Sequence, residues 1–124
     1  TSCADIDFSV VTSFTFNRLK RDRLRALNTE LQRLFGHDAS EIRAQVGFAH
    51  AYDMTHLLAK AIRLAGSTDR AAIRDAMQKI GPHTGIVRRY EKPFADGRHE
   101  ALDAKAAFMA RFRPDGSLDP IPAR

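Results

Sequence analysis

Apolar positions in the first third of the chain predict a strand followed by a helix. Residues 8–13, with the sequence FSVVTS, place two valines beside phenylalanine and threonine, a composition typical of a half-buried strand. After Asn17, leucines recur at the spacing of one helix face, at Leu24, Leu27, Leu31 and Leu34. Gly36 stands where a left-handed residue ends many helices. We therefore expect a strand over 8–13 and a helix over 18–35.

Two more helices are predicted next. The segment 43–65 carries apolar residues on more than one face, which indicates a helix covered on both sides. Gly66 ends this helix. Ser67 or Thr68 is placed to accept a hydrogen bond from a free N–H of the following helix, and Asp69 is favourably placed at the positive end of its dipole. A single apolar stripe runs along that third helix, formed by Ala72, Ile73, Ala76, Met77 and Ile80. The Gly-Pro pair at 81–82 ends it, because proline cannot continue a helix.

The period of the pattern changes from that of a helix to that of a strand after the third helix. With a period of two, Ile86, Arg88 and Tyr90 would face one way and Val87 and Arg89 the other. Over 108–113, Phe108, Ala110 and Phe112 alternate with Met109, Arg111 and Arg113, so both stretches are predicted strands. Between them, the stretch KPFADGRHEALD at 92–103 contains proline and glycine and predicts a loop. The PDGS turn at 114–117 leads into a short return strand over 118–121. The order of a strand, three helices and further strands predicts an α/β fold.

Composition places the chain among ordinary globular proteins. Its 124 residues include 20 Lys and Arg against 15 Asp and Glu, for a formal net charge of +5, and 44% of them are hydrophobic. No apolar run approaches the length of about 18 residues that a membrane span needs, so we expect no direct membrane insertion. The single cysteine, Cys3, excludes an intramolecular disulfide.

The positive charge raises the alternative of a small basic nucleic-acid-binding protein. Its candidate element is the first helix, with the cations Arg18, Lys20, Arg21, Arg23, Arg25 and Arg33. These cations are spread around the helix axis, and no aromatic residues are interleaved with them to set the register on a nucleic acid. A solvated helix face explains them better, so we expect no nucleic-acid partner and keep this function as the weaker alternative.

Candidate chemistry is sparse. His50, Asp53 and His56 lie at i, i+3 and i+6 of the second helix, where they span about 120° of arc, a poor spacing for binding one metal ion. The i, i+4 histidine pair of the HExxH pattern is absent. No serine stands in a GxSxG elbow, and no glycine-rich loop is built to hold phosphate. We therefore expect no catalytic residue, no metal site, no cofactor and no enzymatic activity.

Four stretches of the chain, in this order, resemble type I periplasmic binding proteins. DFSVVTSFTF at 7–16 is similar to a strand that brings the chain back across the hinge of those proteins. AYDMTHLLAKAIRLAGSTDRAAIRDAMQKI at 51–80 is similar to their buried helix opened by Tyr-Asp and the short helix that follows. TGIVRRYEKPFADGRHEAL at 84–102 resembles a hinge-crossing strand, and AAFMARFRPDGSLDPIP at 106–122 resembles the closing hairpin. The branch most similar is that of the branched-chain amino acid (Leu/Ile/Val) binding proteins of ABC importers.

The resemblance implies the C-terminal part of a doubly wound α/β fold, because members of that family are much longer than this chain. It implies a single partial domain over 1–124, made of a hinge strand at 8–16, a helical lobe segment at 17–81, and hinge-crossing strands with a C-terminal hairpin at 84–124. Hinge positions, which absorb the rotation of closure, are then expected in the segments 12–16, 89–94 and 111–114.

The resemblance also implies a function. It implies a solute-binding component of an ABC-type importer, located in the periplasm, that binds an amino acid or similar small polar ligand without chemistry and hands it to a permease. Gly47 and Phe48 match a region that lines the ligand pocket, while a core role for Phe48 stays open. A ligand-sensing regulatory protein on the same fold is the alternative. Since the predicted elements have apolar area on several faces, we also expect self-association, by strand pairing or hairpin exchange.

Overall fold

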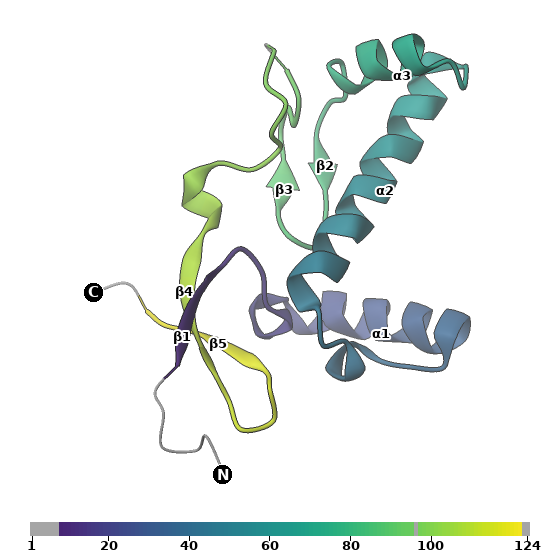
Figure 1. Ribbon diagram of the computed structural model, residues 1–124. Coiled ribbons are helices and arrows are strands. Elements are labelled where there is room, and N and C mark those ends of the chain that lie inside the picture. The colour runs from purple at the N-terminus through teal and green to yellow at the C-terminus, as the bar shows by residue number, and fades with distance from the viewer. Residues whose placement is uncertain (1–7, 96, 123–124) are drawn as a thin grey trace. The chain divides into compact units, whose positions relative to one another are not determined.

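The computed structural model describes residues 8–95 and 97–122 (Figure 1). The elements in chain order are β1 (Ser9–Thr12), η2 (Phe16–Arg18), α1 (Arg21–Phe35), η3 (Ala39–Glu41), α2 (Gln45–Ala65), α3 (Arg70–Met77), β2 (His83–Thr84), β3 (Arg89–Tyr90), η4 (Ala104–Ala106), β4 (Phe108–Phe112) and β5 (Leu118–Pro120), where η marks a short 3-10 helix. The expected α/β order of a strand, three helices and then strands is confirmed.

The chain divides into two compact units. The described residues up to Phe48 and from Ala106 onward form unit 1, and Ala49–Lys105 form unit 2. The chain therefore passes between the units inside α2 and again at residues 105–106. Neither passage lies in the three segments where the resemblance places hinge positions.

Unit 1 contains an antiparallel sheet of three strands in the order β1-β4-β5. Ala110 of the central strand β4 lies opposite Val10 on one side and Pro120 on the other. The predicted hairpin at the C-terminal end is confirmed, because the N–H of Arg113 donates to the Ser117 carbonyl at 2.8 Å and closes the β4–β5 turn. Gly116 occupies this turn with φ of 82°, a conformation that glycine adopts without strain.

A polar group at the centre of unit 1 sets where α1 begins. Thr15 is fully buried, and its hydroxyl donates to the carbonyl of Leu118 at 2.7 Å. The same oxygen accepts from the N–H of Asn17 and caps the short helix η2. This turn takes up the first residues of the predicted helix, so α1 begins at Arg21 and not at Arg18. Its predicted end is confirmed, because Gly36 is left-handed with φ of 72°.

In unit 2, α2 and α3 pack into an apolar cluster with the segment that follows β3. The cluster consists of Leu57, Ala61, Ala76, Ile80 and Phe94. The predicted cap of α3 was wrong. The carboxylate of Asp69 accepts from the N–H of Ala72 at 2.9 Å, while Ser67 accepts from the N–H of Asp69. α3 ends at Met77, and Ile80 reaches the cluster from the turn beyond it.

The predicted strand over 86–90 is present only at its end. β3 covers Arg89–Tyr90 and pairs antiparallel with β2, which the sequence pattern did not predict. The residues between the two strands form a turn, in which the N–H of Gly85 donates to the Arg88 carbonyl at 2.9 Å. The N–H groups at 86 and 87 bind a side chain of α2, so these residues cannot continue the strand.

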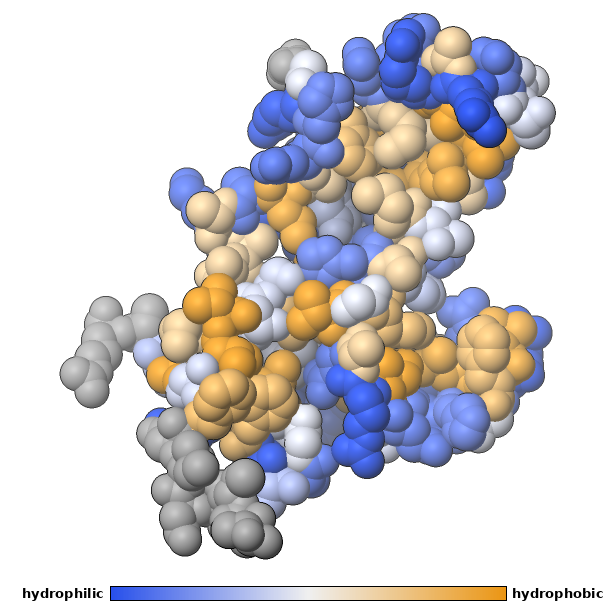
Figure 2. Space-filling model, viewed as in Figure 1, coloured by the Kyte–Doolittle hydropathy of each residue, from blue (hydrophilic) through white to orange (hydrophobic). Residues whose placement is uncertain are grey.

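Within this chain alone, α2 is not covered on both sides. Along this helix, Met54 is 46% exposed, Leu58 is 41% exposed and Leu64 is 55% exposed. Hydrophobic side chains are visible on the surface of both units in Figure 2. No helix among the described residues has the length and apolar content that a bilayer span requires.

Candidate functional site

Gly47 and Phe48, the residues implied as ligand lining, lie in the first turn of α2 and belong to unit 1. Gly47 is exposed, and a Cβ added to it would meet no atom within 4 Å. Phe48 is half-buried, with its ring 6.0 Å from the ring of Phe16 at an interplanar angle of 49°. The backbone at Gly47 and part of the Phe48 ring are therefore accessible within unit 1. Their role as ligand lining stays a prediction.

A side-chain hydrogen bond of Gln45 connects this first turn of α2 to the rest of unit 1. Its Oε1 atom accepts a hydrogen bond from the N–H of Phe16 at 3.3 Å. Phe16 in turn packs edge-on against Phe14, with 5.1 Å between ring centroids. The segment after β1 therefore positions both the start of α2 and the ring of Phe48.

Among the described residues of unit 2, the most buried charged group is the carboxylate of Asp53, which is 1% exposed. It accepts hydrogen bonds from the N–H of Ile86 at 2.6 Å, from the N–H of Val87 at 3.0 Å and from the hydroxyl of Tyr90 at 2.8 Å. From the spacing of His50, Asp53 and His56, the only role considered for Asp53 was that of a poorly placed metal ligand. The structure gives it another role, because its carboxylate fastens α2 to the β2–β3 turn.

A signal for this role is present in the sequence. The buried residues of α2 recur every four positions, at Ala49, Asp53, Leu57 and Ala61. One aspartate in an otherwise apolar stripe predicts a buried carboxylate that needs hydrogen-bond donors from another element. Which donors it finds depends on the β2–β3 turn, which the pattern of residues 83–90 did not reveal.

Two neighbours fit closely around this carboxylate. Burial, and then the hydrogen bond to Asp53, raise the pKa of the Tyr90 hydroxyl well above its ordinary value, so Tyr90 remains a donor at neutral pH. A Cβ added to Gly85 would overlap the Asp53 carboxylate. Glycine is thus required at position 85 by the close approach of a side chain.

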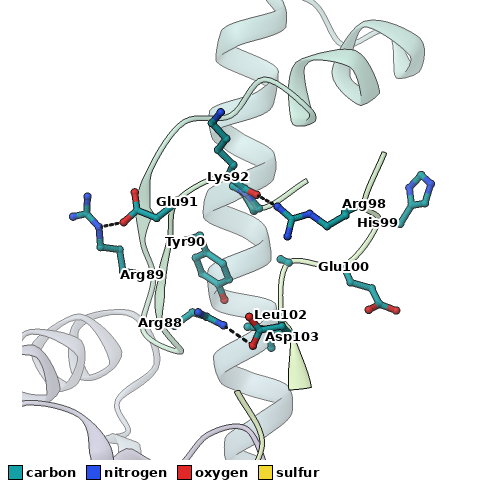
Figure 3. Close-up of a pocket in the computed structure, with 12 residues that line it drawn as sticks. Arg88, Arg89, Tyr90, Glu91, Lys92, Arg98, His99, Glu100, Leu102 and Asp103 are labelled. Carbon is teal, nitrogen blue, oxygen red and sulfur yellow. Dashed lines mark hydrogen bonds and ion pairs between the residues drawn. The ribbon is translucent and has the colours of Figure 1, made fainter. Parts of the chain in front are cut away.

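A hollow of about 560 Å³ lies in unit 2, between residues 88–93 and residues 98–103 (Figure 3). Arg88 approaches Asp103 at 3.5 Å, and Arg89 binds Glu91 at 2.7 Å. Figure 3 shows Arg98 reaching back to the backbone of Lys92, whose carbonyl accepts from it at 3.5 Å.

The charged side chains around this hollow do not point toward a common position where a ligand could bind. Three of its arginines are engaged with neighbouring groups, and His99 and Glu100 point away from Tyr90 in Figure 3. Tyr90 is buried, and its hydroxyl is held by Asp53. We therefore do not assign the ligand site to this hollow.

The remaining candidates from the sequence are the possible metal ligands, the basic residues near α1 and Cys3. Among residues 8–95 and 97–122, no group of three or more His, Cys, Asp or Glu side chains is arranged to hold a metal ion. The ring of His56 packs against Tyr52, with 4.5 Å between centroids. Of the basic residues near α1, Arg18 places its guanidinium 4.3 Å from the ring centroid of Phe108, inside unit 1. Cys3 lies outside the described residues.

Comparison with known proteins identifies the fold. No protein-family model matches the sequence, and no curated protein matches it. The structure is similar to the crystal structure of a periplasmic binding protein type 1 from Bordetella pertussis Tohama I, with a TM-score of 0.67 and 18% sequence identity. The match covers 93% of this chain and 33% of that chain, so this chain spans about a third of its length. The chain thus has a partial fold of the periplasmic-binding-protein type.

Proposed function

We propose that this chain is the C-terminal part of a periplasmic solute-binding protein that serves an ABC importer. Its ligand is an amino acid or a similar small polar molecule, which it binds and releases without chemical change. The observation that carries the proposal is the fold likeness to a periplasmic binding protein over 93% of the chain. The resemblance of the stretches at 7–16, 51–80, 84–102 and 106–122 to the branched-chain amino acid receptors supports the ligand class.

In this proposal, Gly47 and Phe48 supply one wall of the ligand site. Gly47 lets the ligand approach the backbone, because nothing lies within 4 Å of where a side chain would begin. Phe48 offers the apolar part of the ligand a ring held in place by Phe16. The groups that bind the ligand's charges come from the part of the receptor that this chain does not cover.

The ligand proposal is tested by calorimetric titration of the natural polypeptide that carries these residues, with a panel of amino acids. We expect saturable binding of at least one of them, and we expect Phe48→Ala to weaken it about ten- to a hundredfold through loss of apolar contact. The matched control is Phe35→Ala, since Phe35 is 66% exposed on α1. Absence of binding to every amino acid, or equal weakening by both variants, contradicts the proposal.

We also propose that the chain by itself associates with further copies. In unit 1, Val11 is 71% exposed and Met109 is 43% exposed, and they lie opposite one another on β1 and β4. On the opposite face of the sheet, since alternate residues of a strand point to opposite faces, Phe8 and Phe112 stack at the strand ends with 5.7 Å between ring centroids, at 57% and 43% exposure. Among the described strands, β1 and β5 each have one unpaired edge. Exposed apolar side chains on both faces of a sheet with open edges favour pairing with a second copy.

A further inference from the structure

A second hollow, of about 410 Å³, lies within unit 1. It is bounded by Asn28 of α1, the turn around η3, Gln45 at the start of α2, and the β4–β5 turn. Its volume falls in the range of about 300–1,000 Å³ that small-molecule sites occupy. Neither Gly47 nor Phe48 lines it.

Two side-chain amides on the wall of this hollow have their orientation fixed. The oxygen of Gln45 accepts from the N–H of Phe16 at 3.3 Å, and the oxygen of Asn28 accepts from the N–H of Ala39 at 2.9 Å. Since a backbone N–H can only donate, the other end of each amide must be its NH2 group. Neither NH2 group has a partner among the described residues, and no buried side-chain nitrogen there lacks one, so both are accessible. The hollow therefore has two fixed, unused pairs of donors.

Charged groups of both signs line the same hollow. One of them, Arg113, donates its Nε–H to the carboxylate of Asp119. Arg43 makes one long hydrogen bond, of 3.4 Å, to the carbonyl of Asp115, and its other N–H groups have no partner in the described part of the chain. Asp38 uses one oxygen to accept from the N–H of Ser40, and Asp115 uses one to accept from the N–H of Ser117. Hydrogen bonds from these serines hold the pKa of both aspartates below the ordinary value, so both are ionised at neutral pH.

This combination of groups selects the charge of a ligand. A simple anion would find the amides and Arg43 but would be repelled by Asp38 and Asp115. A simple cation would find the two carboxylates but would be repelled by Arg43 and Arg113. A molecule that carries a carboxylate and a protonated amine satisfies both sets of groups.

We propose that the hollow in unit 1 binds a small zwitterion, whose carboxylate accepts from Gln45, Asn28 and Arg43 while its ammonium group faces Asp38 and Asp115. The apolar side chains of Leu24 and Ile42 on the same wall leave room for a short aliphatic substituent. This proposal does not depend on the receptor function, because it uses neither Gly47 nor Phe48 and needs no residue outside unit 1.

The test is a titration of the 15N-labelled chain followed by NMR of its side-chain NH2 groups at constant ionic strength. L-Alanine is the zwitterion, and acetate and methylammonium each carry one of its charges. We expect L-alanine to shift the NH2 resonances of Gln45 and Asn28 in a saturable way, with affinity at least about tenfold above that of either single-charge probe. The side chain of Gln78, exposed in unit 2, serves as the control and stays unshifted.

The discriminating variant is Gln45→Glu, which keeps an acceptor for the N–H of Phe16 and replaces the proposed donor with a carboxylate oxygen. We expect it to weaken L-alanine binding about tenfold or more, while Gln78→Glu leaves the affinity unchanged. Shifts as strong with acetate as with L-alanine, no saturable shift, or unchanged affinity in a folded Gln45→Glu chain would each overturn the proposal.

Discussion

Replacing Asp53 with alanine lowers the free energy of unfolding by about 3–5 kcal/mol, because it leaves buried donors without an acceptor. The N–H groups of Ile86 and Val87 and the hydroxyl of Tyr90 all donate to this carboxylate. Without it, the β2–β3 turn loses its attachment to α2. Urea unfolding followed by circular dichroism measures the loss, and hydrogen exchange of the 86 and 87 amides should accelerate.

The matched control for this variant is Asp22→Ala. The side chain of Asp22 is 93% exposed and lies 3.6 Å from Arg25 in a surface ion pair. Such pairs contribute little, so the control should change the free energy of unfolding by less than about 1 kcal/mol. Equal stability of the two variants would show that the Asp53 carboxylate is not a structural attachment.

Gly85→Ala should be nearly as damaging, with an expected loss of about 2–4 kcal/mol, although it adds a single methyl group. The added Cβ would occupy the place of the Asp53 carboxylate, so either the turn or that carboxylate must move. Moving the carboxylate weakens its hydrogen bonds to Ile86 and Val87. Thermal and urea unfolding of the same preparation measure the change.

Gly81→Ala provides the comparison at a second glycine of unit 2. Its added Cβ would meet no atom within 4 Å, and its φ does not lie in the left-handed region. We expect it to leave stability unchanged or to raise it by up to about 1 kcal/mol, since alanine restricts the unfolded chain. A Gly85→Ala variant as stable as Gly81→Ala would contradict the close packing around Asp53.

Local patterns in the sequence predicted the elements that depend on neighbouring residues. The C-terminal hairpin follows from alternation over 108–113 and the turn at 114–117, and its strands pair as expected. The end of α1 follows from Gly36, which is left-handed. These features could be predicted because turn chemistry and periodicity act over a few residues.

Features that depend on distant contacts were not predictable in the same way. The start of α1 shifts because Thr15 binds the carbonyl of Leu118, more than a hundred positions away in the chain. The strand predicted over 86–90 is shortened because Asp53 takes two of its N–H groups. In each case a side chain competed with regular secondary structure for a backbone group.

In the candidate sites, too, some features depend on one stretch of sequence and others on contacts between distant residues. Gly47 and Phe48 were identified through the resemblance of one segment, and the structure places them in an accessible first turn of α2. The donors of the hollow in unit 1 come from α1, the start of α2 and the residue Arg43 before it, and one of its carboxylates comes from the β4–β5 turn. These groups come close together only through tertiary packing, which no single stretch of sequence encodes.

The central proposal is that this chain is one part of a larger fold of the periplasmic-binding-protein type, whose apolar faces need cover. Size-exclusion chromatography with light scattering, at micromolar concentration, tests it on the chain itself. We predict a mass at least twice the 13.9 kDa of one chain, and Val11→Lys, which places a charge on the exposed sheet face, should shift it toward one chain. A stable monomer, with the radius of gyration of about 14 Å that a compact chain of this length has, would contradict the account.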